Sequence, residues 1–241
     1  MKSKTLNDRF LDLVSKYAVT VPQQWELTMF AAQNENGISI WGIRDTELNN
    51  GVIPLFPWRS ERRFVELRRI VETKTLEEVA LCRFSHVTDD TAANLNRVLY
   101  QEFDLLEWIV GSPIVSVSAS TNGSRFSNVL ARLENGTIAS VEAGTTLPSG
   151  TAALDRHELI ARRGVASDRV VDTHIPQQSV CLFDQNGVQS WTDTDAELFG
   201  LENEQINAVR AAFELARTQE LAAMNITQHD HLLELIGRVR A

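Results

Sequence analysis

The chain has 241 residues, 43% of them hydrophobic, so it is long enough to bury a sizeable core. Lys and Arg number 23 against 32 Asp and Glu, which gives a formal net charge of −9. This acidic balance argues against nucleic-acid and anionic-membrane partners, because both need basic surfaces. No apolar run approaches the ~20 residues of a membrane span. The N-terminus lacks the apolar segment of a secretory signal, so we expect a cytoplasmic protein.

Two cysteines, Cys82 and Cys181, stand alone within apolar runs. This favours two small buried side chains over a disulfide or a metal pair. The sequence contains no phosphate-binding glycine loop of either common type, no C-x-x-C, no H-x-x-x-H and no G-x-S-x-G nucleophile motif. No lysine lies after Lys74, so a mechanism that needs a catalytic lysine must draw on the first 74 residues.

The N-terminal region predicts two helices and a strand. One helix is expected from Asp8 to Tyr17 with Asn7 as its cap, and a second from Pro22 to Gln33, where Pro22 suits a first turn. Residues 38–43 (ISIWGI) read as a short strand. We expect residues 1–51 to form a vestigial, helical N-terminal extension and residues 52–241 to form the main domain.

The main domain begins with an apolar segment, residues 52–58, whose two prolines indicate an edge strand or an extended connector. A helix then follows from Ser60, its expected cap, with an apolar stripe on one face. The other faces carry four arginines, which are more typical of a solvated surface than of an anion or partner site: Arg62, Arg63, Arg68 and Arg69. Residues 77–87 alternate as a strand, and a helix over 97–110 ends at Gly111.

After Pro113 the pattern changes to strands joined by tight turns. Asn135-Gly136 and Asn186-Gly187 are strong hairpin signals, since both dipeptides accept positive φ. The expected strands are 115–120, 126–134, 137–144, 156–164, 180–184 and 188–191. Helices are expected over 202–219 and from Asp230. Together these elements predict an α+β fold: an open, largely antiparallel, mixed sheet with helices packed on one face.

The strands carry apolar residues on both faces, with Val129 and Leu133 on one side and Phe126 and Leu130 on the other. Few helices remain to cover the second face. A second copy of the same sheet is the simplest cover, so we expect a homodimer through that face.

Several polar residues fall where strands and helices meet, and four of them are candidate ligand-binding residues: Arg59, His86, Gln101 and Asp104. His86 reads either as a hydrogen-bonded strand histidine or as a site residue. Asp104 has apolar neighbours, and a buried carboxylate needs a partner such as an arginine or a backbone amide. Glu102 lies two residues from Asp104 on one helix, so the two carboxylates do not form an acid pair. His229 and His231 favour a helix cap over a zinc site.

From residue 52 onward the chain resembles the C-terminal domain of the glucose–fructose oxidoreductase, inositol dehydrogenase and MocA (Gfo/Idh/MocA) family. The order of segments carries the resemblance: VIPLFPWR, ERRFVELRRIV, LEEVALCRFSHV, DLLEWIVGSPIVSVSAS, VLARLENGTIASVEAG, ELIARRGVAS and VCLFDQNGVQSW. The resemblance covers roughly three quarters of the chain. It implies an NAD(P)-dependent sugar or polyol oxidoreductase in which an open sheet binds substrate and mediates oligomerisation.

The chain departs from that family pattern in three places. A complete Rossmann domain does not fit in residues 1–51, and the family's Glu-Lys-Pro segment has no match. The family's Asp and His positions before FDLLEWIVG fall at about Arg97 and at Gln101. Glutamine cannot exchange a proton near neutral pH as histidine can. The resemblance therefore implies the fold and argues against the reaction, so no catalytic residue, metal or cofactor is predicted for the isolated chain.

Three hypotheses follow for function. The leading one is a homo-oligomeric, oxidoreductase-like domain that lacks its own nucleotide site, is non-catalytic alone and binds a sugar-like ligand. The second is a subunit of an NAD(P)-dependent sugar or polyol dehydrogenase whose Rossmann domain is a separate chain. The third is a purely structural interaction module, which predicts a dimer without a ligand-sized polar cleft.

Overall fold

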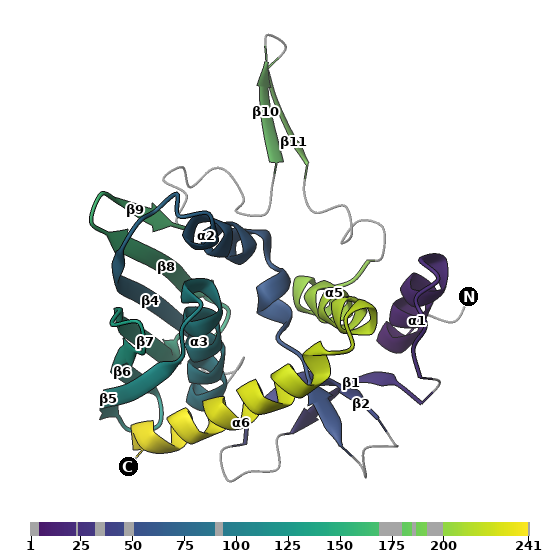
Figure 1. The fold of residues 1–241 in the computed structure, drawn as a ribbon, viewed down its shortest axis with the longest axis horizontal. Helices are drawn as coiled ribbons and strands as arrows, with labels where there is room; N and C mark the ends of the chain where they lie inside the picture. Colours follow the sequence, from purple (N-terminus) through teal and green to yellow (C-terminus); the bar gives the residue numbers. More distant parts are fainter. Residues whose placement is uncertain are drawn as a thin grey trace.

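The computed structural model describes residues 5–22, 24–31, 37–45, 51–89, 94–168, 180–184, 187–191 and 200–240. A six-stranded mixed sheet with helices on one face forms the larger part of the structure, and a three-stranded antiparallel sheet lies beside it (Figure 1). This is the predicted α+β architecture. None of the helices in the described ranges combines the length and apolar character needed to cross a bilayer.

The large sheet has the strand order β5-β6-β7-β4-β8-β9. Its strands are β4 (Val79–Asp89), β5 (Ile114–Asn122), β6 (Phe126–Leu133), β7 (Ile138–Leu147), β8 (Leu154–Ala161) and β9 (Gly164–Ser167). β4 and β7 pair in parallel, and the other neighbours pair antiparallel. The predicted hairpin at Asn135-Gly136 is confirmed: it joins β6 to β7, and Gly136 has φ of 89°.

A second hairpin, β10 (Val180–Asp184) and β11 (Gly187–Trp191), forms its own two-stranded sheet. Both strands were predicted from the sequence. The turn at residues 185 and 186 lies outside the described residues.

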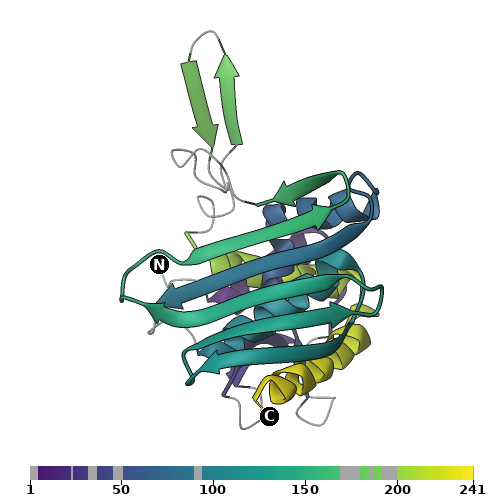
Figure 2. The same cartoon turned by 90° about the vertical axis from the view of Figure 1, so that its left-hand side faces the viewer.

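Helices α2 (Arg62–Glu72), α3 (Leu95–Val110) and α6 (Leu221–Arg240) lie on one side of the large sheet, and its other face is open (Figure 2). α3 is buried along almost its whole length because its apolar residues face both the sheet and α6. Phe103, for example, is fully buried in the same core as Phe84 of β4. α3 ends at Gly111, whose φ of 70° is the left-handed conformation that glycine adopts without strain.

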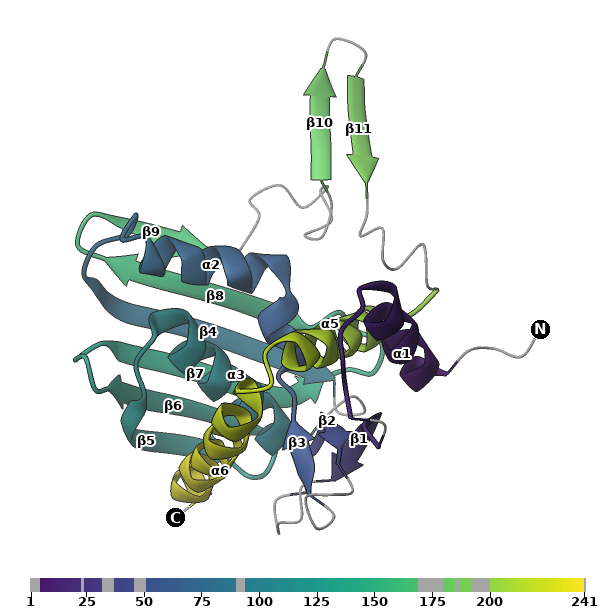
Figure 3. The same cartoon turned by 45° about the vertical axis from the view of Figure 1, so that its right-hand side comes forward.

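A second apolar core lies under the small sheet of β1 (Glu26–Ala31), β2 (Ser39–Arg44) and β3 (Val52–Pro54). Helices α1 (Leu6–Lys16) and α5 (Asn203–Arg217) pack against each other on one side of these strands (Figure 3). A 3-10 helix, η1 (Pro57–Ser60), then leads from β3 into α2. Among the described strands, β3 pairs with β2 alone and stands at the edge of its sheet, as the prolines of residues 52–58 predicted.

The second predicted N-terminal helix, from Pro22 to Gln33, is wrong. Residues 26–31 form β1, and at its start the exposed Glu26 lies between the buried Trp25 and Leu27. This alternation has the two-residue period of a strand, and pairing with β2 outweighs the local helical propensity. The N-terminal region is therefore only partly helical, and the pairing of β2 with β3 continues past residue 51.

Three predicted helix starts also differ from the structure. Asn7 does not cap α1; Thr5 and Asp8 form a capping box, and the Asn7 side chain instead accepts the Leu27 amide at 2.9 Å. Ser60 belongs to η1, and Glu61 takes the cap position of α2. α6 begins nine residues before Asp230, so the histidines at 229 and 231 lie inside a helix. Each error reflects a partner that lies far away in the sequence or a helix without a strong start signal.

Replacement of Gly42 by alanine should destabilise the small sheet. A Cβ at this position would lie 2.5 Å from atoms of Phe30 and Val52, so β1 or β3 must shift. We expect a loss of about 1–3 kcal/mol in the free energy of unfolding, measured by urea denaturation. Gly237→Ala is the matched control, because it lies in α6 with no atom within 4 Å of the added Cβ. It should stabilise the protein by up to about 1 kcal/mol, and equal effects of the two changes would contradict the packing argument.

Candidate functional site

The most connected buried side chain is His157, on the inner face of β8. Its Nδ1 lies 2.6 Å from an Asp168 oxygen, and its Nε2 lies 2.9 Å from an oxygen of Glu102 on α3. The Phe64 and Phe84 rings each approach it edge to face at 4.7 Å. The imidazole is thus held on every side, and it is fully shielded from water.

These contacts fix the charge of His157. An ionised carboxylate can only accept hydrogen bonds, so both ring nitrogens facing Glu102 and Asp168 must carry protons. Burial alone would lower the pKa of His157, but the charge of Glu102 and the two hydrogen bonds outweigh it and raise the pKa to about 10. Burial likewise tends to raise the pKa of Glu102, yet His157 and His86 bring it down to about 2. The pair is an ionised imidazolium and carboxylate at neutral pH.

Arg63 joins this pair to the N-terminus of α2. Its guanidinium donates to Asp168 at 3.0 Å, to Asp155 at 2.5 Å and to Glu61 at 2.9 Å. Burial would lower its pKa, but these three carboxylates raise it above the ordinary value. We call the connected set the His157 network: Glu61, Arg63, His86, Glu102, Asp155, His157 and Asp168.

His86, on β4, is the histidine of the network that lines a cleft, together with Glu61, Arg63 and Asp155. Its Nδ1 lies 3.0 Å from the second oxygen of Glu102. Because Glu102 is ionised, that nitrogen must donate, which leaves the lone pair of neutral His86 on Nε2. Burial lowers the pKa of His86, but the hydrogen bond and charge of Glu102 raise it by more, so its pKa lies above the usual value.

The cleft has a volume of about 280 Å³ and lies where the two cores meet. Six elements supply its lining: η1 and α2 from one side, β4, β8 and α3, and the first turns of α5 from the other side. Its lining residues are Pro57, Trp58, Glu61, Arg63, His86, Thr88, Arg97, Val98, Gln101, Asp155, Asn203, Glu204 and Asn207. Arg97 of α3 forms an ion pair with Glu204 of α5, and it also donates to the Ser39 carbonyl at 2.6 Å.

The four sequence-predicted ligand residues divide into two pairs. His86 and Gln101 both line the cleft. Arg59 and Asp104 instead pair with each other outside the lining residues, and Asp104 is fully buried. Arg59 is thus the arginine partner that was expected for this carboxylate. An Asp104 oxygen also accepts a hydrogen bond from the Trp58 indole N–H at 2.7 Å. A ligand role for the Arg59 and Asp104 pair stays a prediction.

Sequence reasoning missed His157, Asp155 and Asp168 altogether. These residues come from β8 and the end of β9, while their partners come from α2 and α3. No spacing in the sequence connects them. The one available signal is that a histidine at a buried strand position needs polar partners from elsewhere.

Two groups in the network have the composition of a metal site. His86, Glu102 and Asp155 form one, and Asp155, His157 and Asp168 form the other, each with ligand atoms within 4.8 Å of one another. A metal needs a free lone pair on histidine. His157 is protonated on both nitrogens, and both Glu102 oxygens accept hydrogen bonds from histidines. The protonation pattern therefore favours an ion network over a metal centre.

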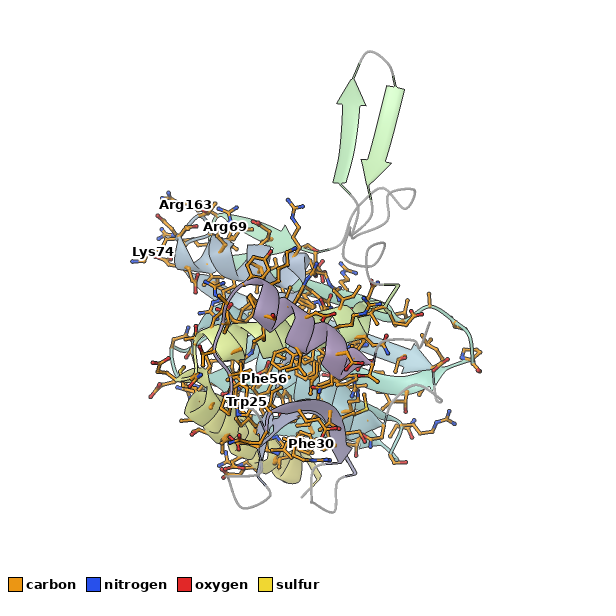
Figure 4. The ribbon with its side chains drawn as sticks, turned by 90° about the vertical axis from the view of Figure 1, so that its right-hand side faces the viewer. Trp25, Phe30, Phe56, Arg69, Lys74 and Arg163 are labelled. Atoms are coloured by element: carbon orange, nitrogen blue, oxygen red, sulfur yellow. The ribbon has the colours of Figure 1, made fainter. Side chains whose placement is uncertain are left out.

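The other arginines of α2 behave as surface charges. Arg68 pairs with Glu72, and Arg69 pairs with Glu66, all of them at least one third exposed. Arg69 lies at the outer corner of the molecule that also carries Lys74 and Arg163 (Figure 4). Exposed pairs of this kind contribute about 0–1 kcal/mol. Among the four, only Arg63 takes part in the network.

The histidines of α6 hold that helix against α3. His229 Nδ1 lies 2.8 Å from the Tyr100 hydroxyl, and His231 Nε2 lies 2.8 Å from a Glu107 oxygen. The cap role predicted for them is wrong, since both lie in the middle of α6.

Comparison with solved structures finds a similar fold in several dehydrogenases. The scyllo-inositol dehydrogenase from Lactobacillus casei with bound cofactor NAD(H) and scyllo-inositol matches with a TM-score of 0.51 and 17% identity, over 77% of this chain and 61% of that one. The fold is that of the C-terminal part of the Gfo/Idh/MocA oxidoreductases. A putative myo-inositol dehydrogenase from Sinorhizobium meliloti 1021 gives a TM-score of 0.55 and 13% identity, over 81% of this chain and 65% of that one.

A third match is myo-inositol 2-dehydrogenase from Lactobacillus plantarum, with a TM-score of 0.52 and 12% identity over 77% of this chain and 61% of that one. This chain spans about 60% of the length of such structures. No family model and no curated protein matches the sequence. The Gfo/Idh/MocA likeness recognised in the sequence is thus confirmed at the level of fold.

The His157 network predicts a specific dependence of stability on pH. The pKa of His157 is higher in the folded chain than in the unfolded chain, so its contribution is fully present below about 6.5 and is lost as the pH rises through about 10. The pKa of Glu102 is lower in the folded chain, so its contribution is present above about 4.5 and is lost as the pH falls through about 2. The free energy of unfolding should therefore decline on the alkaline side from about pH 6.5.

Glu102→Gln removes the charge between the two histidines and should cost about 3–5 kcal/mol near pH 6, because it leaves a buried imidazolium with one carboxylate fewer. Its alkaline decline should be shallower than that of the unmodified chain. Glu158→Gln is the control: it removes a carboxylate that pairs with half-exposed Arg156 on the open face, and should change stability by less than about 1 kcal/mol. Urea denaturation across pH 5–10 measures both. A Glu102→Gln protein as stable as this control would contradict the assigned charges.

Proposed function

We propose that this chain is an oxidoreductase-like domain that binds a sugar-like ligand in the cleft beside His86 and Gln101, is non-catalytic alone and assembles as a homodimer. The single observation that carries the proposal is the polar cleft of about 280 Å³, which lies in a fold shared with inositol dehydrogenases. Its lining combines the neutral hydrogen-bonding groups of Gln101, Asn203 and Asn207 with the apolar surface of Pro57 and Trp58. Polyols need this combination, because their hydroxyls alternate with C–H faces.

The lining supports binding more than chemistry. Gln101 offers an amide donor and acceptor at the point where the family resemblance implies histidine, and an amide does not exchange protons near neutral pH. Both arginines that line the cleft are already engaged, Arg63 with three carboxylates and Arg97 with Glu204. The cleft therefore lacks an obvious catalytic acid or base at the Gln101 position.

The alternative is a substrate-binding and oligomerisation subunit of an NAD(P)-dependent sugar or polyol dehydrogenase. One observation favours it: the chain aligns with about 60% of the length of the solved dehydrogenases, which leaves a large part of them without a counterpart in this sequence. A separate chain with a Rossmann domain would then supply the nucleotide site. The two versions share the ligand cleft and differ in the partner.

Binding of a simple polyol tests the cleft directly. Titration with scyllo-inositol or myo-inositol should perturb the fluorescence of Trp58, which lines the cleft, and isothermal titration gives the affinity. Gln101→Leu should weaken binding about tenfold, because the polyol loses a hydrogen bond while a polar pocket wall becomes apolar. Gln219→Leu is the control, since its amide donates to the Thr20 carbonyl and the residue does not line the cleft.

NADH added to the same samples separates the two versions. Saturable NADH binding by the chain alone would contradict a domain without its own nucleotide site. Hydride transfer that appears only with a co-purified partner chain would favour the alternative. Absence of polyol binding at millimolar concentration would contradict both versions and leave the structural module.

The open face of the large sheet is the proposed dimer surface. Exposed apolar side chains recur along it, including Leu130 at 58%, Ile138 at 51% and Val165 at 61% exposure. The strand register aligns Ile138 with Leu81, Ile160 and Val165 in one apolar row across β7, β4, β8 and β9. Exposed apolar rows on a sheet face are typical of surfaces covered by a partner. Assembly of two such sheets around a twofold axis would cover both rows.

Ile138→Arg should therefore shift the protein from dimer to monomer, because it places a charge in the middle of the apolar row. Sedimentation velocity measures the change directly. Met224→Arg is the matched control, since Met224 is equally apolar and 65% exposed but lies on α6. A chain that is strictly monomeric before any substitution would remove the dimer from the proposal, and a dimer unaffected by Ile138→Arg would place the interface elsewhere.

A further inference from the structure

The cleft and the network behind it carry an excess of negative charge. The carboxylates in this region are Glu61, Glu102, Asp155, Asp168 and Glu204, and the cations are Arg63, Arg97 and His157. With His86 neutral, five negative charges face three positive ones, which leaves an excess of two. Protonation of His86 reduces the excess to one and does not reverse its sign. An anionic ligand is therefore disfavoured at this site, and a cationic group is favoured.

His86 supplies a directed hydrogen-bond acceptor in the same place. Its Nδ1 must donate to Glu102, so the lone pair of the neutral ring is on Nε2. Among the residues that the structure describes, none forms a hydrogen bond with Nε2, and His86 lines the cleft. The acceptor is thus available to a ligand, and its orientation is set by a carboxylate that His157 keeps ionised.

Asp155 adds a second unmet acceptor at the wall. One of its oxygens binds Arg63. The other, Oδ1, is shielded from solvent, has no hydrogen-bond partner within the described ranges and lies 3.6 Å from Nδ1 of His157, beyond hydrogen-bond distance. A carboxylate oxygen without a donor is costly when buried. The Asp155 carboxylate strengthens the negative potential beside His86, because the side chains of Asp155 and His86 both line the cleft and lie close together.

We propose that the ligand of this cleft is an aminated polyol or sugar, whose protonated amine donates a hydrogen bond to Nε2 of His86 next to Asp155. The proposal rests on the proposed sugar-like ligand and names its chemical class. A primary ammonium has three N–H donors and one positive charge, so it satisfies the free acceptor and offsets the excess charge together. A neutral hydroxyl would donate to the free acceptor but would not offset the excess negative charge, and a sugar acid would increase that excess.

The experiment compares scyllo-inosamine with scyllo-inositol. All six hydroxyls of scyllo-inositol are equivalent, so replacing one by an amine gives a single compound and removes any uncertainty about which position carries the charge. Isothermal titration at pH 7.5 should give about tenfold tighter binding for the amine, as expected for a charged hydrogen bond in place of a neutral one. The preference should shrink as salt is added.

Asp155→Asn should reduce this preference to about twofold or less, since it removes one charge and keeps the shape of the side chain. If that protein fails to fold without its Arg63 pair, Glu204→Gln replaces it. Glu204 is half-exposed on the α5 wall, so its loss should weaken the preference by a smaller factor. Ser140→Ala on the open sheet face is the control and should leave the preference unchanged.

Acidification gives a second readout. His86 is faced by Glu102 from α3 and by Asp155 and His157 from β8. As the pH falls through the pKa of His86, Nε2 becomes protonated and the acceptor is lost, so the amine should bind progressively less tightly while scyllo-inositol changes little. Equal affinities of the two compounds at pH 7.5 would overturn the amine proposal and leave the proposed function standing. Binding of neither compound would overturn both.

Discussion

The ion pair between His157 and Glu102 is the interaction around which the large half of the molecule is arranged. It joins β8 to α3 through the centre of the core, where water cannot screen it. A buried charge is tolerated only when its partners are complete. Asp168 completes one side of His157, and His86 completes the second oxygen of Glu102. Loss of any one partner would leave a charge in the apolar core beside Phe64 and Phe84.

The ion pair between His157 and Glu102 also determines which hydrogen-bonding groups line the cleft. His157 keeps Glu102 ionised, Glu102 fixes the tautomer of His86, and His86 presents its free nitrogen beside Gln101. The tautomer that His86 presents to a ligand is therefore determined by His157, which lies in the core and is joined to His86 through Glu102. A change at His157 or Asp168 would alter the cleft without touching any lining residue.

Much of the fold could be predicted from local patterns, because local physics controls those elements. Asn135-Gly136 specifies a tight hairpin, Gly111 ends α3, and Pro54 is compatible with the edge position of β3. The helix predicted over 22–33 failed because residues 26–31 take their structure from pairing with β2, which the local sequence does not reveal. The order of elements was more informative than any single propensity, since it alone indicated the fold of the dehydrogenase C-terminal domain.

The site was less accessible to sequence reasoning. His86 and Gln101 were recognised because they fall near the point where a predicted strand and a predicted helix meet, and the need of Asp104 for a partner followed from its apolar neighbours. The network behind them draws on residues 61, 63, 102, 155, 157 and 168, whose only relation is the register of β4 against β8 and the packing of α2 and α3 over them. Charge pairing across elements requires the tertiary structure, because each partner is an ordinary surface residue type when read alone.

The position of the cleft between two separate cores has a consequence for ligand binding. β4, α3 and β8 belong to the large core, whereas α5 packs with α1 and the small sheet. Arg97 of α3 is one link between them, since it binds Glu204 of α5 and the Ser39 carbonyl of β2. A ligand that contacts both α5 and the large-core side of the cleft would add a further connection between the two cores. Its binding energy would then depend on how firmly the cores are already held together, so Arg97 should influence affinity through the spacing of the walls even where it does not touch the ligand.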